Sequence, residues 1–452
     1  MPGTEPLEGK MTETSNSTNI PTKLQRIAKL ARSAPQMAFT TLAHHIDLEW
    51  LRAAYRQTRK SSAPGVDEVT AKEYAANLDA NLADLLDRFK SGRYYAPPVR
   101  RVYIPKGDGK SVRPIGIPTF EDRVLQRAVT MVLEAVYEQD FLPCSFGFRR
   151  GRSQHQALAD LRQFLMANRG GWVIDLDVSK FFDTLDHQHL RKILDQRVRD
   201  GVIRRVIGKW LKAGVLEKES LSYSETGTPQ GGVISPMLSN IYLHEVLDSW
   251  FAHDVMPRLH GPAHLVRFAD DAVIVVATEQ DAQRLLEVLP KRMGRFGLTV
   301  HPEKTRLVPF QHPWISGNER PDTFNFLGFT LSWAKTAKGG WAVKLKTAKD
   351  RFKRALQRVK QWCQKHRHDP VRKQCRELGK KIVGHCQYYG VTGNTHDVRK
   401  FAWQVRKLWR KWLNRRSQGR GLTLEQFDQL LERYPLPPAL CLRSVLRPVA
   451  KP

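Results

Sequence analysis

The stretch "HLVRFADDAVIVV", residues 264–276, places two adjacent carboxylates, Asp270 and Asp271, inside a segment that is otherwise apolar and rich in β-branched residues. This composition is typical of a strand, a tight turn and a second strand. Aspartate is common in turns because its side chain hydrogen-bonds the local backbone, so the pair alone also fits an ordinary turn. Residues elsewhere in the chain determine whether these two carboxylates form an ordinary turn or a functional site.

The chain has 452 residues, enough to bury a large core in two or three domains. Lysine and arginine number 74 against 45 acidic residues, a formal net charge of +29. Such an excess favours a polyanionic partner, with nucleic acid ahead of an anionic membrane surface. No apolar run approaches the ~18 residues of a membrane span, and none follows the N-terminus as a signal peptide would, so we expect no membrane insertion.

The five cysteines form no Cys-X-X-Cys pair and their number is odd. A disulfide framework is therefore not expected, and a reducing compartment fits better. The group Cys363, Cys375, His385 and Cys386 matches no common zinc spacing, which favours buried or unused thiols over a metal site.

Positive charge is concentrated in the last quarter of the chain. Residues 341–452 contain 28 basic and 7 acidic residues, an excess of 21, in segments with helical periodicity. Phe401, Val405 and Trp412 share one face of a helix, as core residues should, while basic residues cover the rest. A basic helical module of this kind is suited to a nucleic-acid backbone. The candidate RNA-binding residues are Arg406, Lys407, Arg410, Lys411, Arg415 and Arg416.

The segment "VRRVYIPKGDGKSVRPIGIP" predicts a hairpin whose Gly-rich tip gathers Lys106, Lys110 and Arg113. A solvated loop is the alternative interpretation of that tip. Strands alternating with helices elsewhere predict an α+β core. The Gly-rich loop "TGTPQGGVISP" should lead into a helix with Ser235 as its N-cap and Pro236 at its first position.

A second carboxylate site lies upstream. The strand-like "WVIDLDV" carries Asp175 and Asp177. Carboxylates in apolar strands are unfavourable unless positive charge neutralises them, and Mg²⁺ is a hard cation that binds carboxylates together with substrate phosphates. Two such ions about 4 Å apart support nucleotidyl transfer. Lys106 and Arg113 would then hold a triphosphate, and the Gln230–Gly231 loop would approach a nucleotide closely.

The ordered motifs "DVSKFFD", "TPQGGVISP", "FADD", "GLTVHPEKT" and "FLGF" resemble the successive motifs of reverse transcriptases. "SSAPGVDEVT", "YIPKGDGKSVRPIGIP" and "PQGGVISPMLSNIYL" resemble, more specifically, the group II intron-encoded reverse transcriptase/maturase. The resemblance extends from about residue 40 to about residue 333, and more loosely through the basic helices.

The resemblance implies roles for individual residues. Asp177 and Asp270 would be the main metal ligands, with Asp271 assisting and the Val178 carbonyl completing the coordination. Phe182 would exclude a ribose 2′-OH and so select dNTPs. The implied nucleotide-binding residues are Lys106, Arg113, Lys180, Phe181, Phe182, Gln230 and Gly231. The implied primer- and template-binding residues are Phe268, Ala269, Lys304 and Gly328.

Phe268 stands where many relatives have tyrosine, a change that keeps the ring, so activity should survive. Asp175 and Asp183 are interpreted as structural carboxylates rather than ligands. The resemblance implies a right-hand polymerase fold, with fingers and a palm built on an antiparallel sheet, followed by an all-helical basic thumb or maturase domain. The expected segments are a disordered tail at 1–22, an N-terminal extension and fingers at 23–170, a palm at 171–340, the thumb at 341–420 and a short tail or reduced DNA-binding segment at 421–452.

The implied function is RNA-directed DNA synthesis with two Mg²⁺ ions, for which Mn²⁺ could substitute. The implied partners are dNTPs, intron RNA and a DNA target or primer, in a bacterial-type cytoplasm. An HNH endonuclease domain is not evident, so a ready-made 3′ end would serve as primer. Two alternatives remain: an RNA-binding splicing factor without polymerase activity, and a retron, CRISPR-associated, diversity-generating or defence-associated reverse transcriptase.

Overall fold

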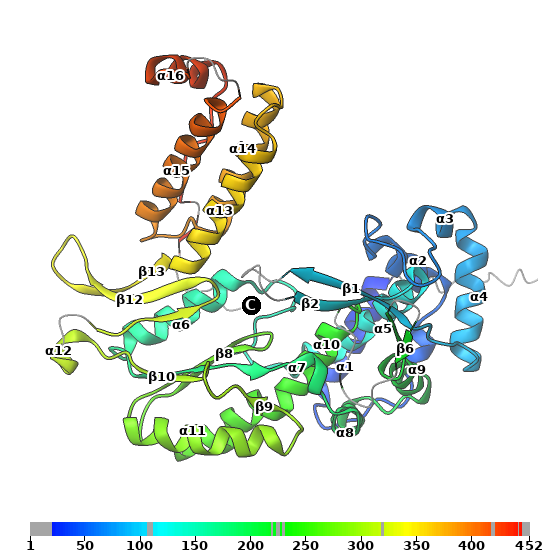
Figure 1. The fold of residues 1–452 in the computed structure, drawn as a ribbon. Helices are drawn as coiled ribbons and strands as arrows, with labels where there is room; N and C mark the ends of the chain where they lie inside the picture. The colour runs from blue at the N-terminus through cyan, green and yellow to red at the C-terminus, as the bar shows by residue number, and fades with distance from the viewer. Residues whose placement is uncertain are drawn as a thin grey trace, which may run out of the picture. The chain divides into compact units, whose positions relative to one another are not determined.

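The computed structural model describes residues 20–105, 112–217, 220–222, 227, 231–317, 321–416, 421–441 and 443–444 (Figure 1). The chain divides into two compact units. The first comprises Met1–Pro97, Pro118–Asp140 and Leu194–Trp210, and the second Pro98–Ile117, Phe141–Ile193 and Leu211–Pro452. Among the described residues, no helix is both long and apolar enough to cross a membrane.

The first unit is helical and centres on α5 (Phe120–Tyr137), which buries most of its side chains. The sequence explains its start, since the Thr119 side chain accepts a hydrogen bond from the Asp122 N–H. Helices α1 and α2 pack against α5, and the Trp50 indole donates to the Ala128 carbonyl over 3.0 Å. The other elements are α1 (Ile20–Ser33), η1 (Ala43–His45), α2 (Leu48–Gln57), α3 (Ala71–Ala76), α4 (Leu78–Ser91) and α9 (Gly201–Leu211). Helix α1 begins inside the segment expected to be a disordered tail, because its apolar face packs on α5.

The second unit contains an antiparallel sheet of strand order β10-β3-β8-β7. These strands are β3 (Trp172–Leu176), β7 (His264–Phe268), β8 (Asp271–Val276) and β10 (Arg306–Pro309). Helices α6 (Gln154–Ala167) and α11 (Glu279–Gly294) pack on opposite faces of it (Figure 1). Covering both faces explains why β3 and β8 read as continuous apolar runs. The strand–turn–strand predicted for residues 264–276 is confirmed.

The predicted basic hairpin also forms, from β1 (Val99–Pro105) and β2 (Val112–Ile117), in a sheet of order β2-β1-β5-β6. Helix α10 begins at Ser235 with Ile234 as its N-cap, one residue earlier than predicted, because Ser235 itself adopts helical geometry. The smaller strands of the unit are β4 (Val178–Ser179), β5 (Val215–Glu217), β6 (Ser220–Ser222), β9 (Thr299–Val300), β11 (Phe324–Phe326), β12 (Phe329–Lys335) and β13 (Trp341–Thr347). The short helices are α7 (Phe181–Thr184), η2 (His244–Ser249), η3 (Phe251–Val255), η4 (Met256–Arg258) and α12 (Pro313–Ser316), and α8 (His187–Arg197) ends in the first unit.

The C-terminal part of the second unit is a helical module with its own core. It consists of α13 (Lys349–Lys365), α14 (Val371–Tyr389), α15 (Thr395–Leu413) and α16 (Leu424–Arg433). Trp409 is fully buried and donates its indole N–H to the Gln374 side chain over 2.9 Å. Phe427 of α16 is buried against Trp409, so α16 packs into the core of this module.

Candidate active site

Sheet register brings the three aspartates of the two motifs together. Strands β3 and β8 pair antiparallel with Leu176 opposite Ala272, and β7 pairs with β8 so that Phe268 faces Asp271. Asp177 directly follows Leu176 and Asp271 directly precedes Ala272, so both lie at the same end of this strand pair. Asp270 occupies the turn beside them. Carboxylates far apart in the sequence therefore share one end of the sheet.

The clustering of negative charge is visible in the acidity of Asp271. Its pKa is raised to about 6, first by the protein atoms that displace water and then by the charges of Asp270, Asp177 and Asp175. Such mutual repulsion favours binding of a cation at this end of the sheet.

The "EKT" segment holds the end of β3 from the other side. The Asp177 N–H donates to Thr305 Oγ1 over 3.2 Å, and the His301 N–H donates to the Asp177 carbonyl over 2.8 Å. Lys304 Nζ lies 3.6 Å from Asp177 Oδ1. An ammonium group therefore lies beside one of the three carboxylates, and the role of Lys304 at the primer stays a prediction.

The carboxylates suit a hard divalent cation. In the described part of the chain, no three His, Cys, Asp or Glu side chains converge closely enough to form a ready-made metal site. The donor set is nevertheless of the oxygen type that Mg²⁺ prefers, and the raised pKa of Asp271 reflects negative charge that a cation would compensate. Asp177, Asp270 and Asp271 therefore fit such an ion chemically.

Asp175 behaves as the sequence suggested, as a structural residue. It faces Arg306 across the β3–β10 pair, with the guanidinium 3.5 Å from the carboxylate. Burial raises the pKa of Asp175, while the charge of Arg306 opposes that rise. Asp183 is exposed on α7.

The predicted nucleotide-binding residues divide into three groups. Lys106 and Gln230 lie outside the described residues. Arg113 is exposed on β2, and Gly231 comes close to the same strand, since a Cβ on it would lie 2.5 Å from the Gly116 carbonyl. The positive φ of 119° at Gly231 is one that glycine tolerates best.

The third group follows β3. Val178 pairs with Val300, and Lys180 is exposed with a left-handed φ of 46°. Phe182 is half-buried. Phe181 differs from the prediction, because its side chain is buried in the core, packed edge-on against Phe182 and Tyr242. The Phe181 ring therefore supports Phe182 from the core and is not exposed toward a nucleotide.

The predicted primer-side residues lie at two turns. Phe268 ends β7, and Ala269 follows it in the turn with a φ of 60°. Gly328 lies with Leu327 in the turn between β11 and β12, where both residues have positive φ. The Tyr388 hydroxyl donates to the Leu327 carbonyl over 2.8 Å, which joins α14 to this turn.

Sequence reasoning missed Tyr388 and Arg351. The positive charge of Arg351, in α13, acts to lower the pKa of Asp271 against the larger effects that raise it. Nothing local in the sequence distinguishes Arg351 from the many other basic residues of the module.

The six predicted RNA-binding residues are not equivalent. Arg410 and Arg416 donate to backbone carbonyls inside the module, at Leu422 and at Asp369 respectively. Arg406 pairs with Asp428 of α16. The remaining three, Lys407, Lys411 and Arg415, are exposed. Lys407 lies 3.6 Å from the ring centroid of the half-exposed Trp403, a pairing of cation and aromatic face suited to a nucleic acid.

Comparison with known proteins identifies the family of the chain. The profile of the family "Reverse transcriptase (RNA-dependent DNA polymerase)" matches residues 104–331. Protein YkfC of Escherichia coli is 35% identical over 347 residues, which cover 68% of this chain and 87% of that protein. Group II intron-encoded protein LtrA of Lactococcus lactis is 36% identical over 227 residues, covering 49% of this chain but 37% of that longer protein. Nuclear intron maturase 4 of Arabidopsis thaliana is 30% identical over 128 residues, 28% of this chain and 16% of that protein.

The fold and the three carboxylates define a right-hand polymerase with a helical C-terminal region, and the chain belongs to the reverse transcriptase family. Within that family its relatives place it with the group II intron-type reverse transcriptases and maturases. The α+β fold and the resemblance stated from the sequence are both confirmed.

Proposed function

We propose that this protein is an RNA-directed DNA polymerase of group II intron type that copies RNA into DNA with the help of two Mg²⁺ ions. The observation that supports it most strongly is that Asp177 and the Asp270–Asp271 turn lie at the same end of the antiparallel sheet. Three acidic side chains at one sheet end have no evident structural advantage, since their mutual repulsion destabilises the fold without a cation.

The proposal gives each residue of the candidate site a role. Bound Mg²⁺ would lower the pKa of a primer 3′-hydroxyl and neutralise charge on the departing pyrophosphate. Asp177, Asp270 and Asp271 would hold the ions, together with the Val178 carbonyl. Arg113 on β2 would contact the triphosphate, and Phe182, supported by Phe181, would stand against the 2′ position of the sugar.

The same proposal assigns RNA to the helical module. The exposed basic residues of α15 would bind intron RNA or the template–primer duplex, and such binding would assist folding of the RNA for splicing as well as its copying. Relatives named as a group II intron-encoded protein and as an intron maturase support this part. The second candidate, an RNA-binding splicing factor without polymerase activity, would not need its aspartates grouped.

Primer extension on poly(rA)/oligo(dT) with Mg²⁺ tests the proposal. We expect extension by the wild type and none by Asp270→Asn, whose RNA affinity should be nearly unchanged because the substitution removes a metal ligand and not a phosphate contact. Asp322→Asn, an exposed carboxylate of the same unit, is the matched control and should extend normally. Equal rates for Asp270→Asn and wild type would refute the assignment of the site, and absence of extension by a folded wild type that binds RNA would favour the splicing factor.

A further inference from the structure

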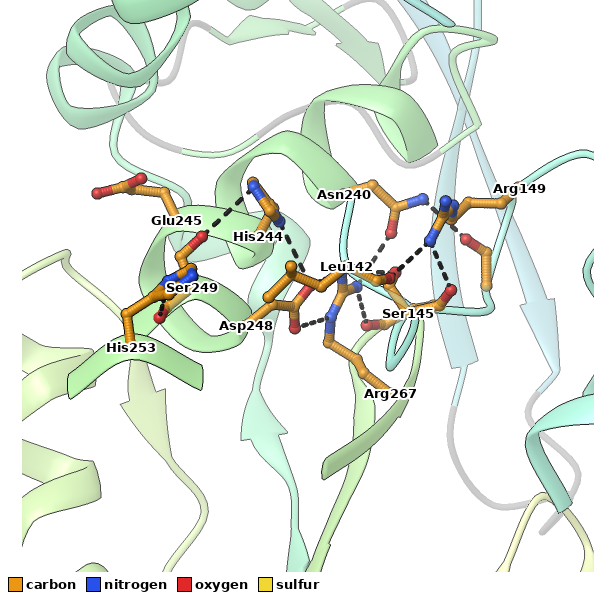
Figure 2. Close-up of polar contacts among 12 residues, drawn as sticks. Leu142, Ser145, Arg149, Asn240, His244, Glu245, Asp248, Ser249, His253 and Arg267 are labelled. Carbon is orange, nitrogen blue, oxygen red and sulfur yellow. Dashed lines mark hydrogen bonds and ion pairs between the residues drawn. The ribbon is translucent and has the colours of Figure 1, made fainter. Parts of the chain in front are cut away.

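Arg267, three residues before Asp270, is completely buried and forms the centre of the polar network in Figure 2. Its Nε and Nη2 donate to the two oxygens of Asp248 over 2.7 and 2.6 Å. Its Nη1 donates to Asn240 Oδ1 and to the Ala269 carbonyl, both over 3.0 Å, and Nη2 also donates to Ser145 Oγ over 2.8 Å. A guanidinium has five N–H donors, so these five bonds use all of them.

The charge of Arg267 is permanent in this site. Burial by itself would lower the pKa of Arg267, but its ion pair and hydrogen bonds with the equally buried Asp248 outweigh burial and raise it. Asp248 lies in η2, a π-helical segment that directly continues α10. Such segments are rare and recur near functional sites. The network is thus a fixed scaffold and not a titrating switch.

One of the five bonds reaches the catalytic turn itself. Ala269, whose carbonyl Arg267 holds, has a φ of 60°, a left-handed conformation that is unfavourable for alanine. The other side of the same residue is closed by Gly147, where a Cβ would lie 2.2 Å from the Ala269 nitrogen. Asn240 connects the two contacts, since its Nδ2 donates to the Gly147 carbonyl over 2.8 Å while its Oδ1 accepts from Arg267.

We propose that Arg267 is a positioning residue for the polymerase reaction: by holding the Ala269 carbonyl it fixes the peptide that precedes Asp270, and with it the direction in which the Asp270 and Asp271 carboxylates point. The competing interpretation is a buried ion pair that only stabilises the core. Two observations favour the positioning role over a purely structural ion pair: the hydrogen bond from Arg267 to the Ala269 carbonyl and the left-handed φ of Ala269. Neither is needed for an ion pair between Arg267 and Asp248. The inference rests on the polymerase function proposed above.

Arg267→Lys tests this, since lysine keeps the charge but has three donors in place of five. Asn240→Ala and Ser145→Ala are milder variants that leave the Arg267–Asp248 pair intact and keep the test decisive if Arg267→Lys folds poorly. Arg197→Lys is the matched control, because Arg197 is also buried and pairs with an aspartate, Asp140, over 2.7 Å, but belongs to the first unit.

Three measurements are made on folded protein: Mn²⁺ affinity by electron paramagnetic resonance without substrate, hydrogen exchange of the 264–276 segment, and the Mg²⁺ dependence of single-nucleotide incorporation. We expect Arg267→Lys to weaken Mn²⁺ binding about tenfold or more, as loss of groups that orient metal ligands does. Exchange in the segment should accelerate, the Mg²⁺ requirement should rise, and RNA affinity should not change. Asn240→Ala should show the same pattern more weakly, and Arg197→Lys should not show it at all.

A lower melting temperature with unchanged Mn²⁺ affinity and unchanged exchange in Arg267→Lys would overturn the inference and leave Arg267 as a core ion pair. Failure of the polymerase function is distinguishable, because then the wild type would not extend a primer although the effects of Arg267→Lys on Mn²⁺ binding and exchange could still be measured.

Discussion

The hydroxyl of Tyr388 in α14 donates a 2.8 Å hydrogen bond to the carbonyl of Leu327, in the turn that also contains Gly328. Burial raises the pKa of Tyr388 to about 12, so the phenol remains a donor under any assay condition. Gly328 of the same turn also lies close to α14, since a Cβ on Gly328 would be 3.1 Å from the Tyr389 hydroxyl. The helical module is therefore joined to the turn expected to meet the primer.

Tyr388→Phe should weaken this connection without disturbing the carboxylates. The loss of one hydrogen bond, about 1 kcal/mol, corresponds to about a fivefold effect on an equilibrium. We expect the length of DNA made per binding event to fall two- to fivefold, as seen in primer extension with a trap, while single-nucleotide incorporation at saturating dNTP is nearly normal. Tyr95→Phe, at an exposed tyrosine, is the control and should match the wild type. Equal product lengths for Tyr388→Phe and wild type would mean that the bond does not help to hold the primer.

The raised pKa of Asp271 predicts a specific pH dependence. Because the folded-state pKa of about 6 lies above the ordinary value of 3.8 for an aspartate, the folded protein binds this proton more tightly than the unfolded chain. Without a divalent ion, the contribution of Asp271 to stability should therefore improve as pH falls through about 6 and be least favourable above it. Asp271→Asn should raise the melting temperature of the metal-free protein at pH 7.5 and have little effect at pH 5.

The same titration governs the response to Mg²⁺. An ionised carboxylate binds the ion and a protonated one does not, so added Mg²⁺ should raise the melting temperature of the wild type more at pH 7.5 than at pH 5. Asp271→Asn should reduce that difference. A Mg²⁺ effect on the wild type that is independent of pH would contradict a coordinating role for Asp271.

Phe182 should select the sugar of the incoming nucleotide. The half-buried Phe182 ring packs edge-on against the buried Phe181, with ring centroids 5.4 Å apart, and this contact holds the Phe182 ring in place. Phe182→Ala should raise incorporation of ribonucleotides relative to dNTPs by about tenfold or more, since a missing ring removes a steric barrier and not an attraction. Phe182→Tyr, which keeps the ring, should retain the preference. An unaltered preference in Phe182→Ala would locate the selection elsewhere.

The sequence could predict the hairpin at Asp270 and the strand before Asp177, because apolar runs covered on both faces have few other interpretations. It could not predict the network around Arg267. Asp248, Asn240 and Ser145 come from separate segments, and only the packed fold shows that their polar atoms meet one guanidinium. Nor could the basic run in and directly after α15 reveal that Arg416 donates to backbone carbonyls of the module while Lys411 remains exposed, since helical spacing gives a direction and not a hydrogen-bond partner.

The difference between the exposed and the internally bonded basic residues in and directly after α15 leads to a prediction about RNA binding. Lys407, Lys411 and Arg415 are exposed, so replacing all three with glutamine should remove phosphate contacts and leave the core of the module intact. If each contacts one phosphate, the slope of log affinity against log salt should decrease by about 2 to 3, and the affinity for intron-type RNA should fall most at low salt. The matched control replaces Arg284 and Lys291 of α11 and Arg295 directly after it, all exposed and in the same unit, and tests whether loss of net charge alone is sufficient. Similar slopes for the two triple variants would mean that the effect is general electrostatics and that α15 is not the RNA-binding surface.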